Sequence, residues 1–417
     1  MSSGFSPHAK VGIIGGGVAA LVASVVFRSE GVGVGDVAVF SPHADPLLSI
    51  EKYGTAIGQQ ELRSETEGHF FPTDFPGLAL LDSIRLRSAR PVVRAAFNAY
   101  HPTFADWLAH GRQVAASLPT THVAAVVGDV VYDAREQVFC VYDTASRLVG
   151  KCEHVVLALG RPGPRVPGWA KSAHVAPFVT HAYEPKQYAG ESVVVVGSGM
   201  AAAHEQVAAL LAGCRVTAVA RSPRVRQDLN LPRCEFTTQA LRRYWALPPA
   251  ERHAFLNTVR TPSYPRKVVW EKLFRNAERE GRLVYVRGEV AEIEVGSWGA
   301  RVRIKGRGVV PAQRIVLATG FEVDARKHAL VDTLRTRYGF AVEQGRIIAD
   351  NNCTVPGIGT PQHMLAVAGG LAEWAIPFAD TVAGMKYVAR RLVATFGLPR
   401  SLGARINTTI QLCRGAL

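Results

Sequence analysis

The stretch Ser192-Val193-Val194-Val195-Val196-Gly197-Ser198-Gly199-Met200-Ala201-Ala202 places an apolar run directly before a glycine turn. Four consecutive valines are typical of a strand that is covered on both faces. The turn has the spacing G-x-G-x-x-A, and a helical pattern continues from it to about Leu211. This order of strand, glycine turn and helix predicts a dinucleotide-binding unit, because the start of the helix leaves N–H groups free for phosphate oxygens.

An earlier stretch has the same order. Val11-Gly12-Ile13-Ile14 is typical of a short buried strand, Gly15-Gly16-Gly17-Val18-Ala19-Ala20 repeats the spacing, and an apolar run continues to Phe27. In this motif Gly15 permits the tight turn, Gly17 lets a pyrophosphate approach the backbone, and Ala20 lets the helix pack closely on the sheet. Two such units in one chain predict an α/β fold with two Rossmann-like dinucleotide-binding domains.

The strands that follow the two glycine turns end differently. Residues 36–40 lead to Ser41, where such units usually carry an acid for a ribose hydroxyl; Ser41 or the downstream Asp45 would take that role. Residues 215–220 lead to Arg221-Ser222-Pro223-Arg224. An arginine at this position accommodates the 2′-phosphate of NADP. Arg221 and Arg224 therefore favour NADPH, the alternative being that they are solvated surface arginines.

The two units together resemble the flavoproteins in which an NAD(P)H-binding domain is inserted into a discontinuous FAD-binding domain. Residues 155–160, Val-Val-Leu-Ala-Leu-Gly, are similar to the strand and turn that close the first FAD segment of those proteins. Residues 315–321, Ile-Val-Leu-Ala-Thr-Gly-Phe, resemble the L-A-T-G-[YF] signature of flavin-containing and N-hydroxylating monooxygenases. Residues 178–183, which include His181, look like a degraded form of a further motif of the flavin monooxygenases.

This resemblance implies an FAD-binding domain of residues 1–185 and 310–417 and an NAD(P)H-binding domain of residues 186–309. The second domain holds an insert at about 227–281 that is rich in arginine and aromatic residues. Helical stretches are expected in the insert at 239–246, 250–260 and 268–280. Its aromatic residues, such as Tyr244, Trp245 and Trp270, are candidates for an oligomer interface, and the oligomeric state is left open.

The resemblance also implies which residues contact FAD and NADPH. They surround the two glycine turns, the strands that follow them and the later A-x-G turns: Gly15, Gly17, Val18, Ala20, Ser41, Val130, Ala158, Gly160, Gly197, Ser198, Gly199, Met200, Arg221, Ser222, Arg224, Thr319, Gly320 and Leu371. Val130 would contact the adenine through its backbone, and Leu371 would open a helix from about 370 through 389 whose start faces the flavin.

Residues 50–71 are expected to form a wall beside the flavin. Within them, Arg63 is a candidate ligand of a flavin phosphate or of a substrate carboxylate. The G-D pair that holds the ribityl chain in such flavoproteins is missing from residues 356–361. No side chain is assigned a catalytic role, because the flavin carries the chemistry.

The function implied by the resemblance is that of an FAD-dependent, NADPH-using monooxygenase. It would oxygenate an amine nitrogen or a sulfur of a small molecule through a C4a-hydroperoxyflavin. One alternative is an FAD-dependent reductase, dehydrogenase or oxidase that inserts no oxygen. The other is a non-catalytic flavoprotein that senses nucleotides or binds nucleic acid.

Composition narrows these choices. The chain has 417 residues, of which 48% are hydrophobic and 20% charged, so it is too apolar to be disordered and long enough for two or three domains. Its net charge of +14 comes from scattered residues without a long basic run, and no nucleic-acid partner is expected. The six cysteines form no C-x-x-C pair, which argues against a redox dithiol or a metal site. The apolar run of residues 11–27 is short and broken by glycines, so we expect a soluble, cytoplasmic protein with no membrane partner.

Overall fold

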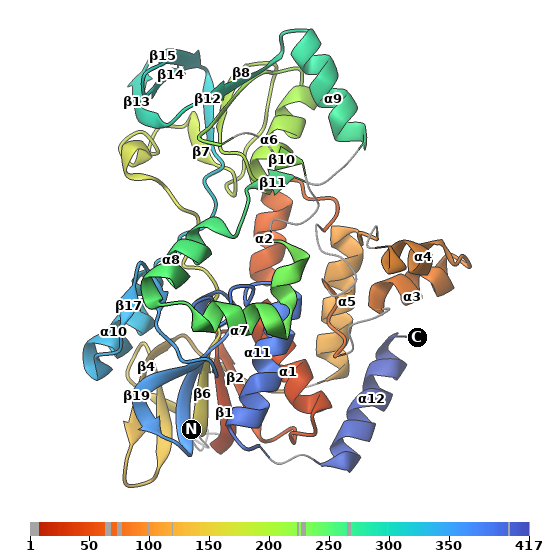
Figure 1. Ribbon diagram of the computed structural model, residues 1–417, viewed down its shortest axis with the longest axis vertical. Coiled ribbons are helices and arrows are strands. Elements are labelled where there is room, and N and C mark those ends of the chain that lie inside the picture. Colours follow the sequence, from red (N-terminus) through yellow and green to blue (C-terminus); the bar gives the residue numbers. More distant parts are fainter. Residues whose placement is uncertain are drawn as a thin grey trace.

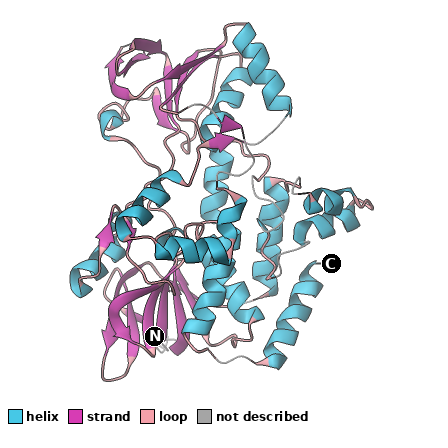
Figure 2. Ribbon diagram, in the orientation of Figure 1, coloured by secondary structure: helices cyan, strands magenta, loops and turns pink. Residues whose placement is uncertain are grey.

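The computed structural model describes residues 8–416 except 63–67, 73–76, 98–99, 119, 223–224, 227–230, 265–267, 298 and 399–400. Its strands gather in two groups at opposite ends of the long axis, with helices between and beside them (Figure 1, Figure 2). Each group contains a sheet with parallel strands and one of the two glycine turns. We call them the first and second units. They confirm the predicted α/β fold with two Rossmann-like units.

The first unit is built on a sheet with the strand order β19-β20-β6-β1-β2-β3. The strands from β20 (His363–Val367) through β6 (Leu148–Leu157), β1 (His8–Ile14) and β2 (Val37–Ser41) to β3 (Thr121–Ala124) run parallel. The chain leaves β1 toward β2 and later returns on the other side as β6. The carboxyl end of β1 is therefore a switch point of the strand order, the place where open α/β sheets bind ligands.

Helices cover this sheet. α1 (Val18–Ser29) follows the first glycine turn and packs against α11 (Val382–Thr395). The remaining elements of this unit are α2 (Leu48–Ala56), α3 (Gly77–Arg85), α4 (Arg90–Ala96), α5 (Phe104–Ser117), β4 (Val127–Asp133), β5 (Val138–Asp143), η4 (Ala325–Lys327), α10 (Ala329–Tyr338), β17 (Val342–Glu343), β18 (Arg346–Ile347), β19 (Thr354–Thr360), η5 (Gly369–Ala372) and α12 (Leu402–Ala416).

The second unit is built on a fully parallel sheet with the order β12-β9-β8-β16-β7. Its strands are β7 (Val179–His181), β8 (Ser192–Val196), β9 (Arg215–Ala220), β12 (Leu283–Arg287) and β16 (Arg314–Leu317). α6 (Met200–Leu211) and α9 (Val268–Arg279) cover the face that carries Val193 and Val195. The opposite face, with Val194 and Val196, packs on η2 (Gly168–Ala170) and on an antiparallel sheet of β13 (Val290–Gly296), β14 (Gly299–Ile304) and β15 (Gly308–Ala312). The short strands β10 (Val225–Arg226) and β11 (Ser263–Tyr264) pair with each other.

Strand pairing corrects the predicted domain boundaries. β7 and β16 lie in the second sheet, whereas boundaries at residues 185 and 310 assigned both to the FAD domain. Ile315 pairs with Val194 on one side and with Val179 on the other. The sequence of a short apolar strand does not indicate which sheet it joins, because its pairing partners are far away in the sequence. The chain therefore enters the second unit after β6 and leaves it after β16.

The predicted insert also divides between the units. α7 (Thr238–Ala246) and α8 (Pro249–Thr258) pack on the first unit: the Tyr244 hydroxyl donates to the Trp374 carbonyl at 2.7 Å, and Trp245 Nε1 donates to the Ala375 carbonyl at 2.9 Å. Only α9 packs within the second unit, with Trp270 buried against α6. Tyr244 and Trp270 are therefore core residues and Trp245 is half-buried, so these side chains do not form an exposed aromatic interface.

The helix predicted from residue 370 through 389 is wrong at its start. η5 is a single 3₁₀ turn, and α11 begins only at Val382, where the Thr381 hydroxyl accepts the N–H of Gly384 at 3.0 Å. Pro377 lies within the predicted helix, and a proline there lacks the N–H that the helix needs. Leu371 consequently lies at no α-helix start.

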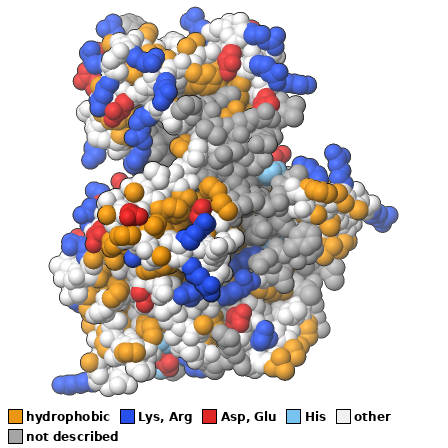
Figure 3. Space-filling model, in the orientation of Figure 1, with side chains coloured by type: hydrophobic (Ala, Val, Ile, Leu, Met, Phe, Trp, Pro, Cys, Tyr) orange, Lys and Arg blue, Asp and Glu red, His pale blue; other side chains and the backbone are white. Residues whose placement is uncertain are grey.

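Charged side chains spread over the surface. On the face in Figure 3, lysine and arginine side chains lie over both units. Several arginines are paired with acids, for example Arg314 with Glu191 at 2.5 Å and Arg326 with Asp324 at 2.7 Å. In the part of the chain that the structure describes, no helix is long and apolar enough to cross a membrane.

Candidate functional site

The first glycine turn lies at the carboxyl end of β1. Gly15 has a φ of +107°, and a Cβ there would lie 2.5 Å from the carbonyl oxygen of Ala158. Gly17 is the N-cap of α1, with no side-chain cap, and a Cβ there would meet nothing within 4 Å. The first turn of α1, which contains Val18 and Ala20, has no acidic residue, and the first N–H groups of a helix lack partners in the preceding turn. The arrangement fits the diphosphate of a dinucleotide.

Ser41 ends β2 and is buried. Its hydroxyl donates to the carbonyl of His43 at 3.0 Å and accepts the N–H of His43 at 3.2 Å. The predicted ribose contact would have to compete with this turn and stays a prediction. Asp45, the alternative, accepts the N–H of Leu47 and forms an ion pair with Arg112 at 2.9 Å.

The adenine contact predicted for Val130 also stays a prediction. Val130 lies in β4, where its N–H donates to Asp129 at 2.8 Å and its carbonyl accepts the Tyr338 hydroxyl at 3.3 Å. The residues that follow β3, rather than Val130, lie beside the end of β2. The N–H of Ala125 donates to the Ser41 carbonyl at 3.2 Å. The next residue, Val126, is 53% exposed. Val126 is therefore the better candidate, and only the strand register reveals it.

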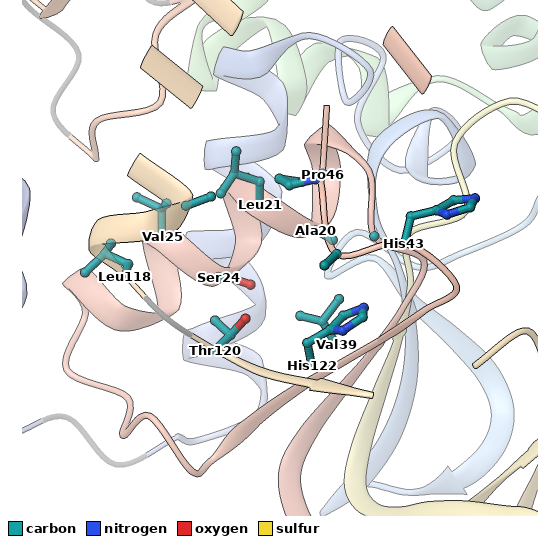
Figure 4. A pocket seen from close by; sticks show the side chains of 13 residues that line it. Ala20, Leu21, Ser24, Val25, Val39, His43, Pro46, Leu118, Thr120 and His122 are labelled. Carbon is teal, nitrogen blue, oxygen red and sulfur yellow. The ribbon is translucent and has the colours of Figure 1, made fainter. Parts of the chain in front are cut away.

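A hollow of about 200 Å³ lies beside the first turn, between α1, β2 and β3 (Figure 4). Its lining consists of Gly16, Ala20, Leu21, Ser24, Val25, Val39, His43, Ala44, Pro46, Ala115, Leu118, Thr120 and His122. The lining includes no lysine, arginine, aspartate or glutamate. This hollow therefore offers no fixed charge to a ligand.

The remaining predicted residues of the first unit differ in their surroundings. Gly160, with a φ of +74° and open space around its Cα, follows Ala158 at the carboxyl edge of the sheet. Leu371 is a core residue of η5. Arg63 lies outside the described residues. In the same expected wall His69 is 1% exposed and packs near Phe71, so it belongs to the core.

The second glycine turn repeats the geometry of the first. Gly197 has a φ of +141°, and a Cβ there would lie 2.3 Å from the Ala318 carbonyl oxygen. Gly199 is the uncapped N-cap of α6, with open space at its Cα. Met200 begins α6, and the first turn of this helix contains no acidic residue. A dinucleotide diphosphate fits this second helix start as it fits the first.

A hollow of about 510 Å³ opens onto the second turn. Its lining comprises Arg165, Pro167, Trp169, Val196, Gly197, Ser198, Gly199, Val219, Ala220, Arg221, Ser222, Pro262, Gly288, Glu289, Val290, Ala318, Thr319 and Gly320. The structure thus brings together seven predicted residues, from both glycine-rich turns of this unit. Thr319 and Gly320 lie here, beside the second glycine turn rather than the first. Arg224 lies outside the described residues.

Residues of both units meet in an aromatic cluster. Tyr183, just after β7, stacks on Phe321 with ring centroids 4.5 Å apart. Tyr53 of α2 meets both rings edge-on, at 5.3 and 5.0 Å. His181 is fully buried beside them, and its Nδ1 accepts the N–H of Tyr183 at 3.2 Å. Burial lowers the pKa of His181 to about 4, so it is a neutral packing residue at the end of β7.

A buried ion pair fixes the segment between β7 and β8 to α6. Lys186 Nζ lies 2.9 Å from Glu205 Oε1, and both side chains are at most 3% exposed. Lys186 also donates to the carbonyls of Ala182 and Glu184. Burial raises the pKa of Glu205, although Lys186 acts in the opposite direction. The helix that follows the second glycine turn is thereby anchored to the segment between β7 and β8.

An ion cluster ties α8 to the first unit beside η5. Arg161 lies 3.2 Å from Glu373 and 3.5 Å from Asp380, and Arg260 lies 3.4 and 2.5 Å from the same carboxylates. Arg346 approaches Glu373 to 3.7 Å. Burial by itself raises the pKa of Asp380, but Arg260 and Arg161 outweigh burial and lower it. The cluster fixes the insert against the loop that follows the glycines of η5.

Little among the described residues indicates a reactive cysteine or a metal site. Cys152 and Cys353 are buried, and burial raises the pKa of each thiol to about 12. Such thiols are poor nucleophiles at neutral pH. In the described ranges, no group of three histidine, cysteine or acidic side chains could hold a metal ion.

Comparison with known proteins agrees with this geometry. The family model for L-lysine 6-monooxygenase/L-ornithine 5-monooxygenase matches residues 87–288. By sequence alone the chain matches none of the curated proteins. Among solved structures, an ornithine hydroxylase from Pseudomonas aeruginosa has 14% identity and a TM-score of 0.71, over 93% of this chain and 98% of that one.

Two further structures are similar. An ornithine N-hydroxylase from Kutzneria sp. 744, with reduced FAD, NADP⁺ and L-ornithine, has 17% identity and a TM-score of 0.70 over 94% of this chain and 99% of that one. A cadaverine monooxygenase from Erwinia amylovora, bound to FAD, has 14% identity and a TM-score of 0.72 over 94% of this chain and 96% of that one. The chain thus has the fold of a flavoprotein with two dinucleotide-binding units, and it resembles the N-hydroxylating and flavin-containing monooxygenases.

Proposed function

We propose that this protein is an FAD-dependent, NADPH-using monooxygenase that hydroxylates the amine nitrogen of a small molecule. One observation carries the proposal: a single chain holds two uncapped helix starts, each open at a glycine turn on the carboxyl edge of a parallel sheet. Each cradle suits one dinucleotide. The family match over residues 87–288 supports N-hydroxylation as the reaction.

Each unit has its own task. The first turn and α1 would hold the FAD diphosphate, while Ala158 and Gly160 line the same sheet edge. The second turn, Arg221 and Ser222 would hold NADPH. When bound, the flavin takes a hydride from NADPH and activates molecular oxygen; the protein orients both cofactors and keeps bulk water away. We place the units at residues 8–157 with 321–416, and at residues 168–317.

The substrate would carry a primary aliphatic amine. The matching family and the similar structures are named for lysine, ornithine and cadaverine, which share that group. The wall formed by α7, α8 and the segment after η5 is the part of this chain best placed to select among them. Its ion cluster of three arginines and two carboxylates keeps that wall fixed. Because the reaction consumes NADPH, we expect the enzyme to work in the cytoplasm.

Steady-state assays with purified, FAD-loaded protein test the proposal. NADPH oxidation and hydroxylamine formation are measured together with L-ornithine, L-lysine and cadaverine. The expected result is a hydroxylamine produced in proportion to the NADPH consumed with at least one of these amines. NADPH oxidation without hydroxylamine for any primary amine would instead indicate the reductase or oxidase alternative. If the protein binds no FAD, every FAD-dependent function is excluded for it.

A further inference from the structure

A second arginine lies beside Arg221 through the register of the second sheet. β12 ends at Arg287, which pairs with Ala220, the last residue of β9. The N–H of Gly288 donates to the Ala220 carbonyl at 2.9 Å, which holds the two strand ends together. Arg287 therefore stands next to the strand end that leads into Arg221 and Ser222, although 65 residues separate Arg221 and Arg287 in the sequence.

Both arginine side chains are free to bind an anion. Arg221 and Arg287 are exposed, and neither side chain forms an ion pair or hydrogen bond with any residue that the structure describes. Other charged groups nearby are paired: Lys305 with Glu289 at 3.1 Å, and Arg282 with Glu280 at 2.6 Å. Two unpaired guanidinium groups on adjacent strand ends leave a local excess of positive charge.

Arg287 also lines a hollow that adjoins the one described above. This hollow measures about 330 Å³ and is lined by Gly197, Ser198, Gln206, Ala218, Ala220, Ser222, Tyr285, Val286 and Arg287. It shares Gly197, Ser198, Ala220 and Ser222 with the larger hollow. Gln206 is 2% exposed, and its Oε1 has no hydrogen-bond partner among the described residues. The hollow thus combines hydroxyls, a buried amide acceptor and a cation at one end of the dinucleotide site.

The first unit provides an internal control for this charge. Val39 pairs with His122 and Ser41 with Ala124 in the first sheet, just as Ala218 pairs with Tyr285 and Ala220 with Arg287 in the second. Ala124 thus occupies the position in the first sheet that corresponds to Arg287 in the second. No lysine, arginine, aspartate or glutamate lines the hollow beside the first glycine turn. FAD has no 2′-phosphate, whereas NADPH has one. Among the described residues that line these hollows, arginine occurs only in the unit where that phosphate would bind.

We propose that Arg287 is a second determinant of NADPH preference and binds the 2′-phosphate together with Arg221 and Ser222. The inference rests on the proposed use of NADPH. A guanidinium provides two parallel N–H donors to a phosphate. Arginines at the ends of two adjacent strands would bind the phosphate from two sides. Arg287 would bind and orient the cofactor and would take no part in the redox chemistry.

Calorimetric titration with adenosine 2′,5′-bisphosphate and with 5′-AMP tests the inference without turnover. In Arg287→Ala we expect affinity for the bisphosphate to fall by about 10- to 100-fold, the range for one or two charge-assisted hydrogen bonds, while affinity for 5′-AMP changes less than about twofold. Arg287→Lys should retain part of the affinity. Arg301→Ala, which removes an exposed arginine of β14, is the matched control and should leave both affinities unchanged.

The outcomes separate this inference from the proposed function. If the wild-type protein favours the bisphosphate and Arg287→Ala keeps that preference, the role of Arg287 is refuted while the use of NADPH stands. If the wild-type protein binds both ligands equally, the use of NADPH fails and this inference with it. An equal loss of both affinities in Arg287→Ala would show a structural role and would also refute the inference.

Discussion

The two nucleotide-binding units share a strand, a glycine turn and an uncapped helix, yet their surroundings differ in charge. Eight and nine residues after the first glycine, α1 carries Ala23 and Ser24, whereas α6 carries Glu205 and Gln206. Across the neighbouring strand, Ala124 of the first unit corresponds to Arg287 of the second. The common geometry fits a diphosphate, and under the proposed function the differences decide which dinucleotide each unit binds and how its helix is anchored.

The largest expected effect comes from the glycines themselves. Gly15→Ala should abolish FAD retention, whereas Gly197→Ala should leave the flavin bound but slow its reduction by NADPH by about 100-fold or more. In each case a Cβ would collide with a carbonyl oxygen, at 2.5 Å and 2.3 Å respectively. Flavin absorbance and stopped-flow reduction distinguish the two losses. Gly35→Ala, at an open site, serves as the control. Identical defects in both variants would contradict the assignment of separate cofactors.

The ion pair of the second unit gives the next effect. Lys186→Met leaves the buried Glu205 with the Tyr188 hydroxyl but without its counter-charge, and should lower the free energy of unfolding by about 3–5 kcal/mol. The double variant Lys186→Met/Glu205→Leu should recover most of this loss, as the apolar Ala23 of the first unit suggests. Chemical denaturation measures both variants. If the double variant is as unstable as the single one, Lys186 and Glu205 stabilise the fold by more than neutralising each other's charge.

Acid should destabilise the first unit more than the second. Burial lowers the pKa of His110 to about 3 and of His154 to about 4 in the first unit, and of His181 alone to about 4 in β7 of the second unit. Since the unfolded chain takes up these protons near pH 6.5 and the folded chain does not, stability is lost as the pH falls from about 6.5 toward 4. Each histidine contributes at most about 1.4 kcal/mol per pH unit.

Thermal melts across that pH range measure this dependence. His154→Gln should flatten it, whereas His122→Gln, at an exposed position, should not. A pH profile of His154→Gln that is as steep as that of the wild type would contradict the assignment of a neutral buried His154.

The smallest expected effect concerns the contact between the units. Tyr53→Ala removes the edge-on contacts with Tyr183 and Phe321 and should cost about 1 kcal/mol beyond the lost buried area. Flavin binding should persist, because Tyr53 does not line the hollow beside the first glycine turn. Differential scanning calorimetry would register the change. Loss of flavin from this variant would show that the aromatic cluster supports the FAD site directly.

The sequence predicts local structure well and long-range pairing poorly. Both glycine turns, their helices and the three insert helices follow from periodicity and glycine spacing, which act over a few residues. The placement of β7 and β16 in the second sheet depends on distant partners. So does the approach of Arg287 to Arg221, since only the register of β12 against β9 reveals it.

The errors around the C-terminal segment have a similar cause. Residues 369–380 are almost entirely buried, which gives them the apolar composition of a core helix, yet they form a 3₁₀ turn and an irregular segment. Trp374 and Ala375 use their carbonyls to receive donors from α7 instead of from the next turn of a helix. The family signature in residues 315–321 was informative about the protein class, although Thr319 and Gly320 lie beside the second turn.

One measurement tests the central claim most directly. FAD-loaded enzyme is incubated with NADPH and each of L-ornithine, L-lysine and cadaverine under ¹⁸O₂, and the products are examined by mass spectrometry. We expect a hydroxylamine with one atom of the heavy oxygen, formed in step with NADPH oxidation. NADPH oxidation that yields only hydrogen peroxide and returns every amine unlabelled would contradict the assignment as a monooxygenase.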